Sequence, residues 1–170
     1  LEGLVPIENI IILTNAAQVP GIKAALPKMP DENIVAEPAR RDTGPAVALA
    51  AGWVAARDPN AVMMVLPADQ LIVDTAGFQS ILSSACAAAG ASQSIVTLGI
   101  KPDWACPSYG YIERGEEVKI ENAELQHPVV EVERFREKPS PEVAAEYLAA
   151  GNFSWNAGIF IWSLETLRAE

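Results

Sequence analysis

Acidic, basic and amide side chains gather in four short segments of this chain. These segments are residues 37–45, 66–69, 108–112 and 134–139, the last taken together with residues 155–158. Runs of β-branched residues alternate with longer helical patterns along the chain, which favours a parallel sheet. Ligands of such sheets bind at the carboxyl ends of the strands, so we expect binding chemistry in these loops.

The first segment reads Glu-Pro-Ala-Arg-Arg-Asp-Thr-Gly-Pro and leads into a predicted helix. Backbone N–H groups at a helix start attract anions, and the two arginines would strengthen that attraction. The carboxylate of Glu37 could accept two hydrogen bonds from the N1 and N2 edge of guanine, which adenine does not offer. The alternative is ordinary helix capping by Asp42 or Thr43 beside solvated arginines.

The second segment, Leu-Pro-Ala-Asp, places Asp69 just after a strongly apolar run. Mg²⁺ favours one or two carboxylates together with the phosphate oxygens of a substrate, so Asp69 is a candidate magnesium ligand. An aspartate that merely stabilises a turn is the alternative.

The remaining segments suit a small polar ligand. Gly110 lies between two tyrosines, where a glycine lets a ligand approach the backbone, although an edge strand with a bulge has the same pattern. Glu137 could accept hydrogen bonds from sugar hydroxyls, Lys138 could neutralise a phosphate, and Asn156 offers both a donor and an acceptor. A surface ion pair and a strand-end asparagine are the alternatives. His127 is assigned no role.

Five motifs follow one another along the chain: Glu-Pro-x-x-Arg-Asp-Thr, Leu-Pro-Ala-Asp, Tyr-Gly-Tyr-Ile, Glu-Lys-Pro and Trp-Asn-x-Gly-x-Phe-x-Trp. In this order the chain resembles the nucleotide-sugar pyrophosphorylases, and among them most closely the mannose-1-phosphate guanylyltransferases, from about residue 10 to residue 167. The resemblance implies a nucleotidyltransferase that makes GDP-mannose and pyrophosphate from GTP and mannose 1-phosphate with Mg²⁺. The sugar phosphate attacks as an anion, so no general base is needed, and positioning and charge screening carry the catalysis.

The resemblance also assigns roles to individual residues. The nucleotide would be bound by Glu37, Arg41, Asp42, Thr43, Gly44 and Ala68. The sugar phosphate would be bound by Tyr109, Gly110, Glu137, Lys138 and Asn156. Asp69 and Lys138 would be catalytic, and Asp69 would hold the metal.

The chain departs from the family pattern at several positions. Gln70 replaces a histidine, Ser108 follows Pro107 where the family has Thr-Gly, Ala157 replaces a serine and Gly44 replaces an alanine. The family's opening loop, Gly-x-Gly-x-Arg-Leu-Trp-Pro, is absent from the sequence. A further aspartate of the metal site is expected beyond the end of the chain.

We therefore expect the chain to be a piece of a longer enzyme, or to be inactive by itself. Two other functions stay open. One is a sugar-1-phosphate nucleotidyltransferase for another base or sugar. The other is a non-catalytic regulatory homologue that keeps a sugar-nucleotide pocket, which the absent glycine-rich loop favours and the retained acidic and basic residues oppose.

The elements that must position these residues follow from periodicity. Strands are predicted at residues 9–14, 33–36, 61–66, 94–98, 109–114, 129–135 and 156–162, and helices at 19–26, 45–57, 77–89, 141–150 and from 163 onward. The polar stretch 115–127 is predicted to be a solvated excursion. The resemblance implies a Rossmann-like nucleotide-diphospho-sugar transferase fold, an α/β fold with a mostly parallel sheet and helices on both faces, and residues 1–170 as one partial domain.

Composition restricts the partners. Of the 170 residues, 50% are hydrophobic, which is enough for a core. The 22 acidic residues exceed the 12 basic ones and give a net charge of -10, which disfavours binding to nucleic acid. Two cysteines outside any Cys-x-x-Cys pair indicate a reducing, cytoplasmic setting, and no apolar run is long enough for a membrane span. A homo-oligomer stays open.

Overall fold

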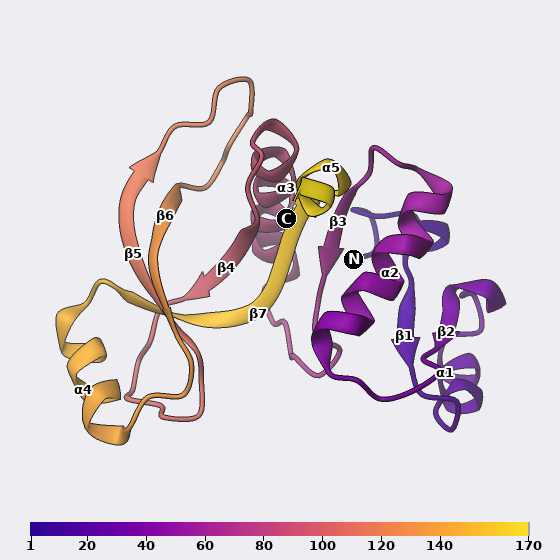
Figure 1. The fold of residues 1–170 in the computed structure, drawn as a ribbon, viewed down its shortest axis with the longest axis horizontal. Helices are drawn as coiled ribbons and strands as arrows, with labels where there is room; N and C mark the ends of the chain where they lie inside the picture. The colour runs from indigo at the N-terminus through magenta and orange to yellow at the C-terminus, as the bar shows by residue number, and fades with distance from the viewer. Residues whose placement is uncertain (170) are drawn as a thin grey trace. The chain divides into compact units, whose positions relative to one another are not determined.

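The computed structural model describes residues 1–169 (Figure 1). Contacts divide the chain into two compact units, one from Leu1 to Ala61 and one from Val62 onward. The first unit contains the segment predicted to bind the base, and the second contains the other predicted site segments. No helix among the described residues is long and apolar enough to cross a membrane.

The first unit is a small strand–helix–strand arrangement followed by a long helix. Its elements are the 3₁₀ turns η1 (Ile7–Asn9) and η2 (Asp31–Asn33), strands β1 (Ile12–Thr14) and β2 (Ile34–Ala36), and helices α1 (Val19–Ala25) and α2 (Thr43–Arg57). The strands β1 and β2 are parallel, as predicted, with Ile12 opposite Ile34. A helical crossover between two parallel strands is the connection that this pairing requires.

One buried asparagine holds this unit together. The side-chain nitrogen of Asn33 donates to the carbonyls of Glu8 and Ile10, each at 2.8 Å, and its oxygen accepts from Arg57 at 2.7 Å. The Arg57 guanidinium also lies 3.9 Å from the centre of the Trp53 ring. Because a buried amide is costly unless it is hydrogen-bonded, these contacts fix the start of β2 relative to the end of α2.

The second unit is built on a five-stranded sheet. Its elements are β3 (Val62–Val65), α3 (Thr75–Ala91), β4 (Val96–Ile100), β5 (Tyr111–Val118), β6 (Val129–Arg136), α4 (Pro141–Ala150), β7 (Phe153–Ser163) and α5 (Leu164–Ala169). The strands follow the order β3-β7-β5-β6, and β4 also pairs with β7. Every pairing in this sheet is antiparallel.

The prediction of a mostly parallel sheet is therefore wrong for the described residues, where only β1 and β2 pair in parallel. Phe160 and Ile161 of β7 each pair with both β3 and β4, so these two strands occupy opposite edges of β7. Since both run antiparallel to β7, they point in the same direction, as a strand–helix–strand unit predicts. Strand β7, which comes later in the chain, lies between β3 and β4 (Figure 1). Each of these two strands therefore pairs antiparallel with β7 and not in parallel with the other.

Helix α3 covers this sheet with small residues. It contacts β3, β4 and β7, and its buried positions include Leu82, Ala85, Ala88 and Ala89. Alanines allow the helix to approach the sheet closely, and their spacing of three and four places them on one helical face. Strand β7, which has partners on both edges, is buried along most of its length, as a central strand should be.

The polar stretch after β5 is less solvated than predicted. Strand β5 runs on to Val118, and the following loop returns to helix α3 before β6 begins. The backbone N–H of Gln126 donates to Ser84 Oγ at 3.0 Å, and Ser80 Oγ lies 2.9 Å from His127 Nε2. These hydrogen bonds attach the end of the excursion to α3, because the helix presents two serines one turn apart.

Candidate sugar-phosphate site and base-binding loop

The candidate site in the second unit lies along one edge of β7. Strand β3 pairs with residues 160–163 of β7, and β5 pairs with residues 153–155. Strand β4 occupies the opposite edge, because it also pairs with Trp155, Phe160 and Ile161. The carboxyl end of β3 and the start of β5 therefore approach each other on a shared edge, with residues 156–159 of β7 between them.

The loop that carries Asp69 enters this gap directly from β3. Gln70 Nε2 donates a hydrogen bond to the Ala157 carbonyl of β7. Gly158 has a positive φ of 70°, and a Cβ at this position would lie 3.3 Å from Pro67 Cγ, so glycine permits both the backbone turn and the close contact. Asp69 itself is exposed, and its carboxylate is free to meet a ligand.

Gly110 stands opposite this loop, immediately before β5. Its carbonyl accepts a hydrogen bond from the Asn156 N–H at 2.8 Å. A Cβ on Gly110 would lie 2.8 Å from Glu137 Oε2 and 3.4 Å from the Phe135 ring. The absence of a side chain on Gly110 lets the carboxylate approach the backbone, so Gly110, Glu137 and Asn156 lie together, as their predicted role in sugar binding requires.

The side chain of Asn156 is held in one orientation. Its Oδ1 accepts from the Gly158 N–H at 3.0 Å and lies 3.2 Å from the Thr97 hydroxyl, which also lies 2.9 Å from the Ile159 carbonyl. A backbone N–H can only donate, so the amide oxygen must face Gly158. The NH₂ group is left for other partners, and Asn156 can act toward a ligand only as a donor.

Lys138 follows Glu137 in a strained backbone conformation. Its φ is 45°, a region that residues with a side chain rarely adopt, and its Nζ lies 3.5 Å from the Glu137 carboxylate. The Lys138 side chain is 67% exposed, so this ion pair contributes little to stability. The cation can therefore leave Glu137 for a phosphate at low cost.

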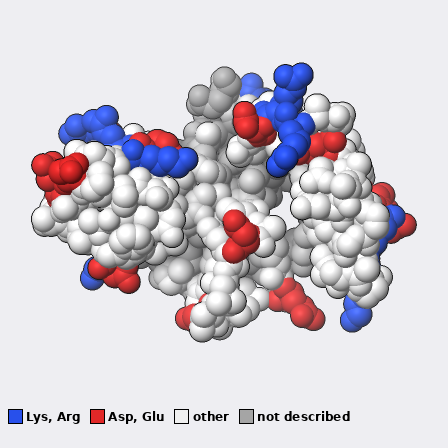
Figure 2. Space-filling model, turned by 90° about the horizontal axis from the view of Figure 1, so that it is seen from below, with Lys and Arg blue, Asp and Glu red and all other residues white. Residues whose placement is uncertain are grey.

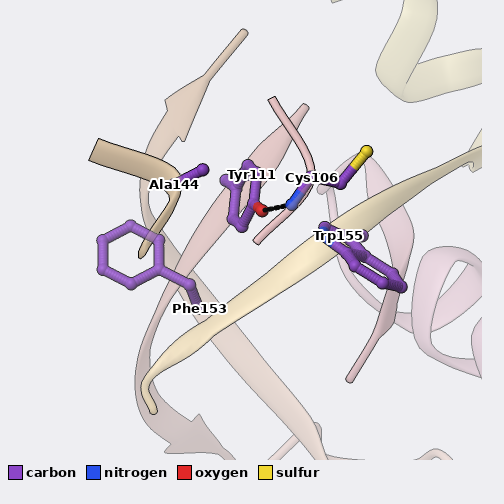
Figure 3. Packing of buried hydrophobic residues seen from close by; sticks show 5 residues of the cluster. All are labelled: Cys106, Tyr111, Ala144, Phe153 and Trp155. Carbon is purple, nitrogen blue, oxygen red and sulfur yellow. Dashed lines mark hydrogen bonds between the residues drawn. The ribbon is translucent and has the colours of Figure 1, made fainter. Parts of the chain in front are cut away.

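An aromatic cluster anchors the chain just before Gly110. The Tyr109 ring contacts Trp155 edge-on, with ring centres 5.2 Å apart, and the Tyr111 hydroxyl accepts a hydrogen bond from the Cys106 N–H at 3.0 Å. Figure 3 shows Tyr111 directed at Cys106 beside Phe153 and Trp155. The residues on both sides of Gly110 are thus held in place, although Ser108 stands where the family pattern has a glycine.

The second unit thus assembles most of the predicted sugar-phosphate and metal residues. Around positions 156–159 of β7 it brings together Asp69, Gly110, Glu137, Lys138 and Asn156. Ala68, which was predicted to bind the nucleotide, precedes Asp69 in the same loop. Tyr109 lies beside them through its contact with Trp155.

The predicted base-binding residues form a loop of the first unit. The Glu37 N–H donates to the Thr14 carbonyl at 2.8 Å, which extends the β1–β2 pairing by one residue. Asp42 precedes helix α2 with a φ of 62°, but its side chain makes no capping hydrogen bond. Capping by Asp42, the alternative to a ligand site, is therefore not seen. Arg41, Thr43 and Gly44 are exposed, so the first N–H groups of α2 stay accessible to a ligand.

The charged side chains on the face drawn in Figure 2 are dispersed. On the face in Figure 2, the basic and acidic residues described by the structure stand in small mixed groups between areas without charge. A polynucleotide needs a continuous basic surface, whereas a mononucleotide needs only one or two cations.

Asp69 is the one magnesium ligand that the sequence predicts. Among residues 1–169, no group of three or more His, Cys, Asp or Glu side chains could hold a metal ion. The exposed carboxylate of Asp69 fits Mg²⁺ as a single protein ligand that acts together with substrate phosphates, which is the coordination this ion favours.

A comparison with protein families matches residues 3–170 to the family described as "Nucleotidyl transferase". This chain belongs to that family. The match extends over both units, and it therefore includes the predicted base-binding loop as well as residues 156–159 of β7.

Curated relatives of this nucleotidyl transferase support the same assignment. A mannose-1-phosphate guanylyltransferase of Sinorhizobium fredii is 42% identical over 139 residues, which cover 81% of this chain and 26% of the relative. Another mannose-1-phosphate guanylyltransferase, of Escherichia coli K12, is 41% identical over 133 residues, or 77% of this chain and 27% of the relative. The chain spans about a quarter of the length of these relatives.

Solved structures share the fold. A structure described as a mannose-1-phosphate geranyltransferase from Thermus thermophilus matches with a TM-score of 0.76 and 30% identity, over 96% of this chain and 45% of that one. A mannose-6-phosphate isomerase from Helicobacter pylori matches with a TM-score of 0.74 and 26% identity, over 96% of this chain and 59% of that one.

Three residues that were not predicted to bind a ligand also contact the site segments: Gln70, Thr97 and Gly158. Gly158 was visible as a glycine within a strand pattern, which signals a close approach or irregular backbone. Thr97 gave no signal, because a threonine in a strand is ordinary. Gln70 was noticed only as a departure from the family, whereas the structure makes it a contact between the Asp69 loop and β7.

Proposed function

We propose that this chain binds GTP and mannose 1-phosphate, and that the protein containing it forms GDP-mannose and pyrophosphate. The observation that carries the proposal is the convergence of Gly110, Glu137, Asn156 and the Asp69 loop on residues 156–159 of β7. The names of the relatives, which are about 40% identical, support the choice of GTP and mannose 1-phosphate.

In the proposed reaction, a phosphate oxygen of mannose 1-phosphate forms a bond to the α-phosphorus of GTP. The bond from that phosphorus to the bridging oxygen of the β-phosphate breaks, and pyrophosphate leaves with the electron pair. The nucleophile is already an anion, so the protein's contribution is to place two negatively charged reactants in line.

Each residue has a distinct task in this scheme. Glu37 accepts hydrogen bonds from the guanine edge, Glu137 accepts from sugar hydroxyls, and Asn156 donates to the sugar. Lys138 places a positive charge beside the sugar phosphate. Mg²⁺, when bound, screens the phosphate charges, and Asp69 is the carboxylate that would hold it.

The first test measures nucleotide preference in the full-length product of the gene that encodes this chain. We expect turnover with GTP and mannose 1-phosphate well above turnover with UTP or dTTP. Glu37→Gln replaces one acceptor with a donor that faces the donors of guanine. It should therefore lower kcat/KM for GTP by about tenfold or more and reduce the preference for GTP over UTP and dTTP. Glu32→Gln, which removes the same charge from an exposed position of the same unit, should leave the preference unchanged.

The other outcomes are equally informative. Turnover that favours UTP or dTTP would assign the chain to another sugar-nucleotide pyrophosphorylase. Binding of GDP-mannose with no turnover under any of these conditions would identify a non-catalytic homologue and refute the proposed activity.

A further inference from the structure

The side chain of Gln70 makes the hydrogen bond that ties the Asp69 loop to β7. Its Nε2 donates to the carbonyl of Ala157, a residue of the central strand that is itself buried. Asp69 makes no hydrogen bond or ion pair of its own among the described residues, so the position of its carboxylate depends on how the loop is held. The chain has a glutamine here where the family pattern has a histidine.

The acceptor of this hydrogen bond lies within residues 156–159 of β7, next to Asn156, which is predicted to bind the sugar. Ala157 stands between Asn156, whose N–H donates to Gly110, and Gly158, whose N–H donates to Asn156 Oδ1. Pro67, three residues before Gln70, packs against Gly158. The loop therefore meets β7 at two points, one apolar and one polar, that flank Asp69 along the chain.

We propose that Gln70 is a positioning residue, which fixes the Asp69 carboxylate relative to the sugar side formed by Gly110, Glu137 and Asn156. The role rests on the proposed function, because it matters only if phosphate and sugar must be aligned. A displacement of about 1 Å at such a site can lower the rate as much as a hundredfold, so one hydrogen bond that restrains the loop has a large effect on kcat.

The geometry explains why a side chain is used. The loop after β3 has left the strand, so its backbone has lost the ladder of hydrogen bonds that held residues 62–65. A long amide can reach the Ala157 carbonyl of β7, and its second N–H remains for solvent or a ligand. A histidine also has a ring N–H that can donate, so Gln70→His tests whether a different donor can replace the amide.

The first arm of the test measures backbone order parameters by NMR in the full-length protein without metal or substrate. Gln70→Met keeps the length of the side chain and removes the donor, and it should lower the order parameters of residues 68–70 from about 0.85, typical of rigid backbone, toward the values below about 0.6 of flexible segments. Gln70→His should restore most of the order. Gln93→Met makes the same change at an exposed position after α3 and should alter nothing in this loop.

The second arm measures turnover. Gln70→Met should lower kcat by about tenfold or more and raise the Mg²⁺ concentration needed for half-maximal rate, while KM for mannose 1-phosphate changes less than about twofold. Gln70→His should recover the rate, whereas a residue with a purely structural role would affect thermal stability without moving the Mg²⁺ dependence.

The two arms separate the proposals. If the unaltered protein forms no sugar nucleotide, the proposed function fails, and order parameters that are unchanged in Gln70→Met would still refute the restraint of the loop by Gln70. If the unaltered protein is active and Gln70→Met matches it in kcat and Mg²⁺ dependence, the positioning role is refuted.

Discussion

At the scale of single residues, the site pairs an acceptor with a donor across Gly110. Glu137 is a carboxylate that only accepts, and Asn156 has its oxygen engaged by the Gly158 N–H, so that only its NH₂ group is free. A sugar hydroxyl is both a donor and an acceptor, and two protein groups of opposite polarity can satisfy it completely. An acceptor beside a donor therefore suits a hydroxyl better than a carbonyl, which cannot donate, or an ammonium group, which cannot accept.

Asn156→Asp tests this division of roles. The aspartate can still accept from Gly158, so we expect the fold to persist, but it has no N–H to offer and adds a negative charge near the phosphate. The affinity for mannose 1-phosphate should fall by about tenfold or more, while that for GTP is unchanged, as measured by calorimetry. Asn122→Asp adds the same charge in the exposed excursion and should leave both affinities intact. Unchanged sugar-phosphate affinity in Asn156→Asp would refute the donor role.

At the scale of elements, helix α4 fixes the end of the segment that carries Glu137 and Lys138. Ser140 lies directly after this segment and caps α4 by accepting from the Val143 N–H at 3.4 Å, with Pro141 at the first helical position. The pKa of Glu142 in the first turn is lowered below its ordinary value of 4.5 by the hydrogen bond from its own backbone N–H and then by the Ser140 hydroxyl.

The cap predicts a pH dependence with a definite sign. A carboxylate whose pKa is lower in the folded state stabilises the fold above pH 4.5, and that contribution is lost as the pH falls through the folded pKa. Ser140→Ala removes one of the two causes, so the pKa of Glu142 should rise toward 4.5, and the free energy of unfolding at neutral pH should drop by about 1 kcal/mol. An NMR titration of the Glu142 carboxyl and urea unfolding check these outcomes. A Glu142 pKa that is the same in both proteins would contradict the assignment.

At the scale of the whole molecule, the chain has a net charge of -10 but carries basic side chains at two of the predicted ligand-binding segments. Arg41 stands in the predicted base-binding loop of one unit and Lys138 in the predicted sugar-phosphate site of the other. Both side chains are exposed, so each can meet a phosphate group without a buried ion pair being broken. Formation of one domain by both units, and any homo-oligomeric assembly, stay predictions.

This charge distribution predicts discrimination between mononucleotides and polynucleotides. Single-stranded DNA should show no saturable binding at physiological salt, because repulsion over most of the surface outweighs a few separate cations. GTP should bind under the same conditions. Fluorescence anisotropy with labelled oligonucleotide and labelled GTP measures both, and saturable oligonucleotide binding with a steep salt dependence would overturn the prediction.

Much of the second unit could be read from periodicity and motif. Helix α3, the capped helix α4 and the strand after Gly151 follow from apolar spacing, Ser140-Pro141 and the terminal glycine. The direction of pairing could not be read in this way, because Phe160 and Ile161 look the same in the sequence whether their neighbours are parallel or antiparallel. The attachment of the excursion to Ser80 and Ser84 was hidden for a similar reason, since a serine in a helical pattern does not show in the sequence whether it is buried against another segment.

By itself the sequence determined the family, the set of candidate residues and the kind of chemistry that each can perform, since these depend on residue type and order. Only the tertiary structure decided that β7 lies between β3 and β4, and that Gly110, Glu137, Asn156 and the Asp69 loop meet along its edge. The physical reason is that these contacts join residues tens of positions apart. Their energies come from strand pairing and from single hydrogen bonds, such as that of Gln70, which leave no periodic trace in the sequence.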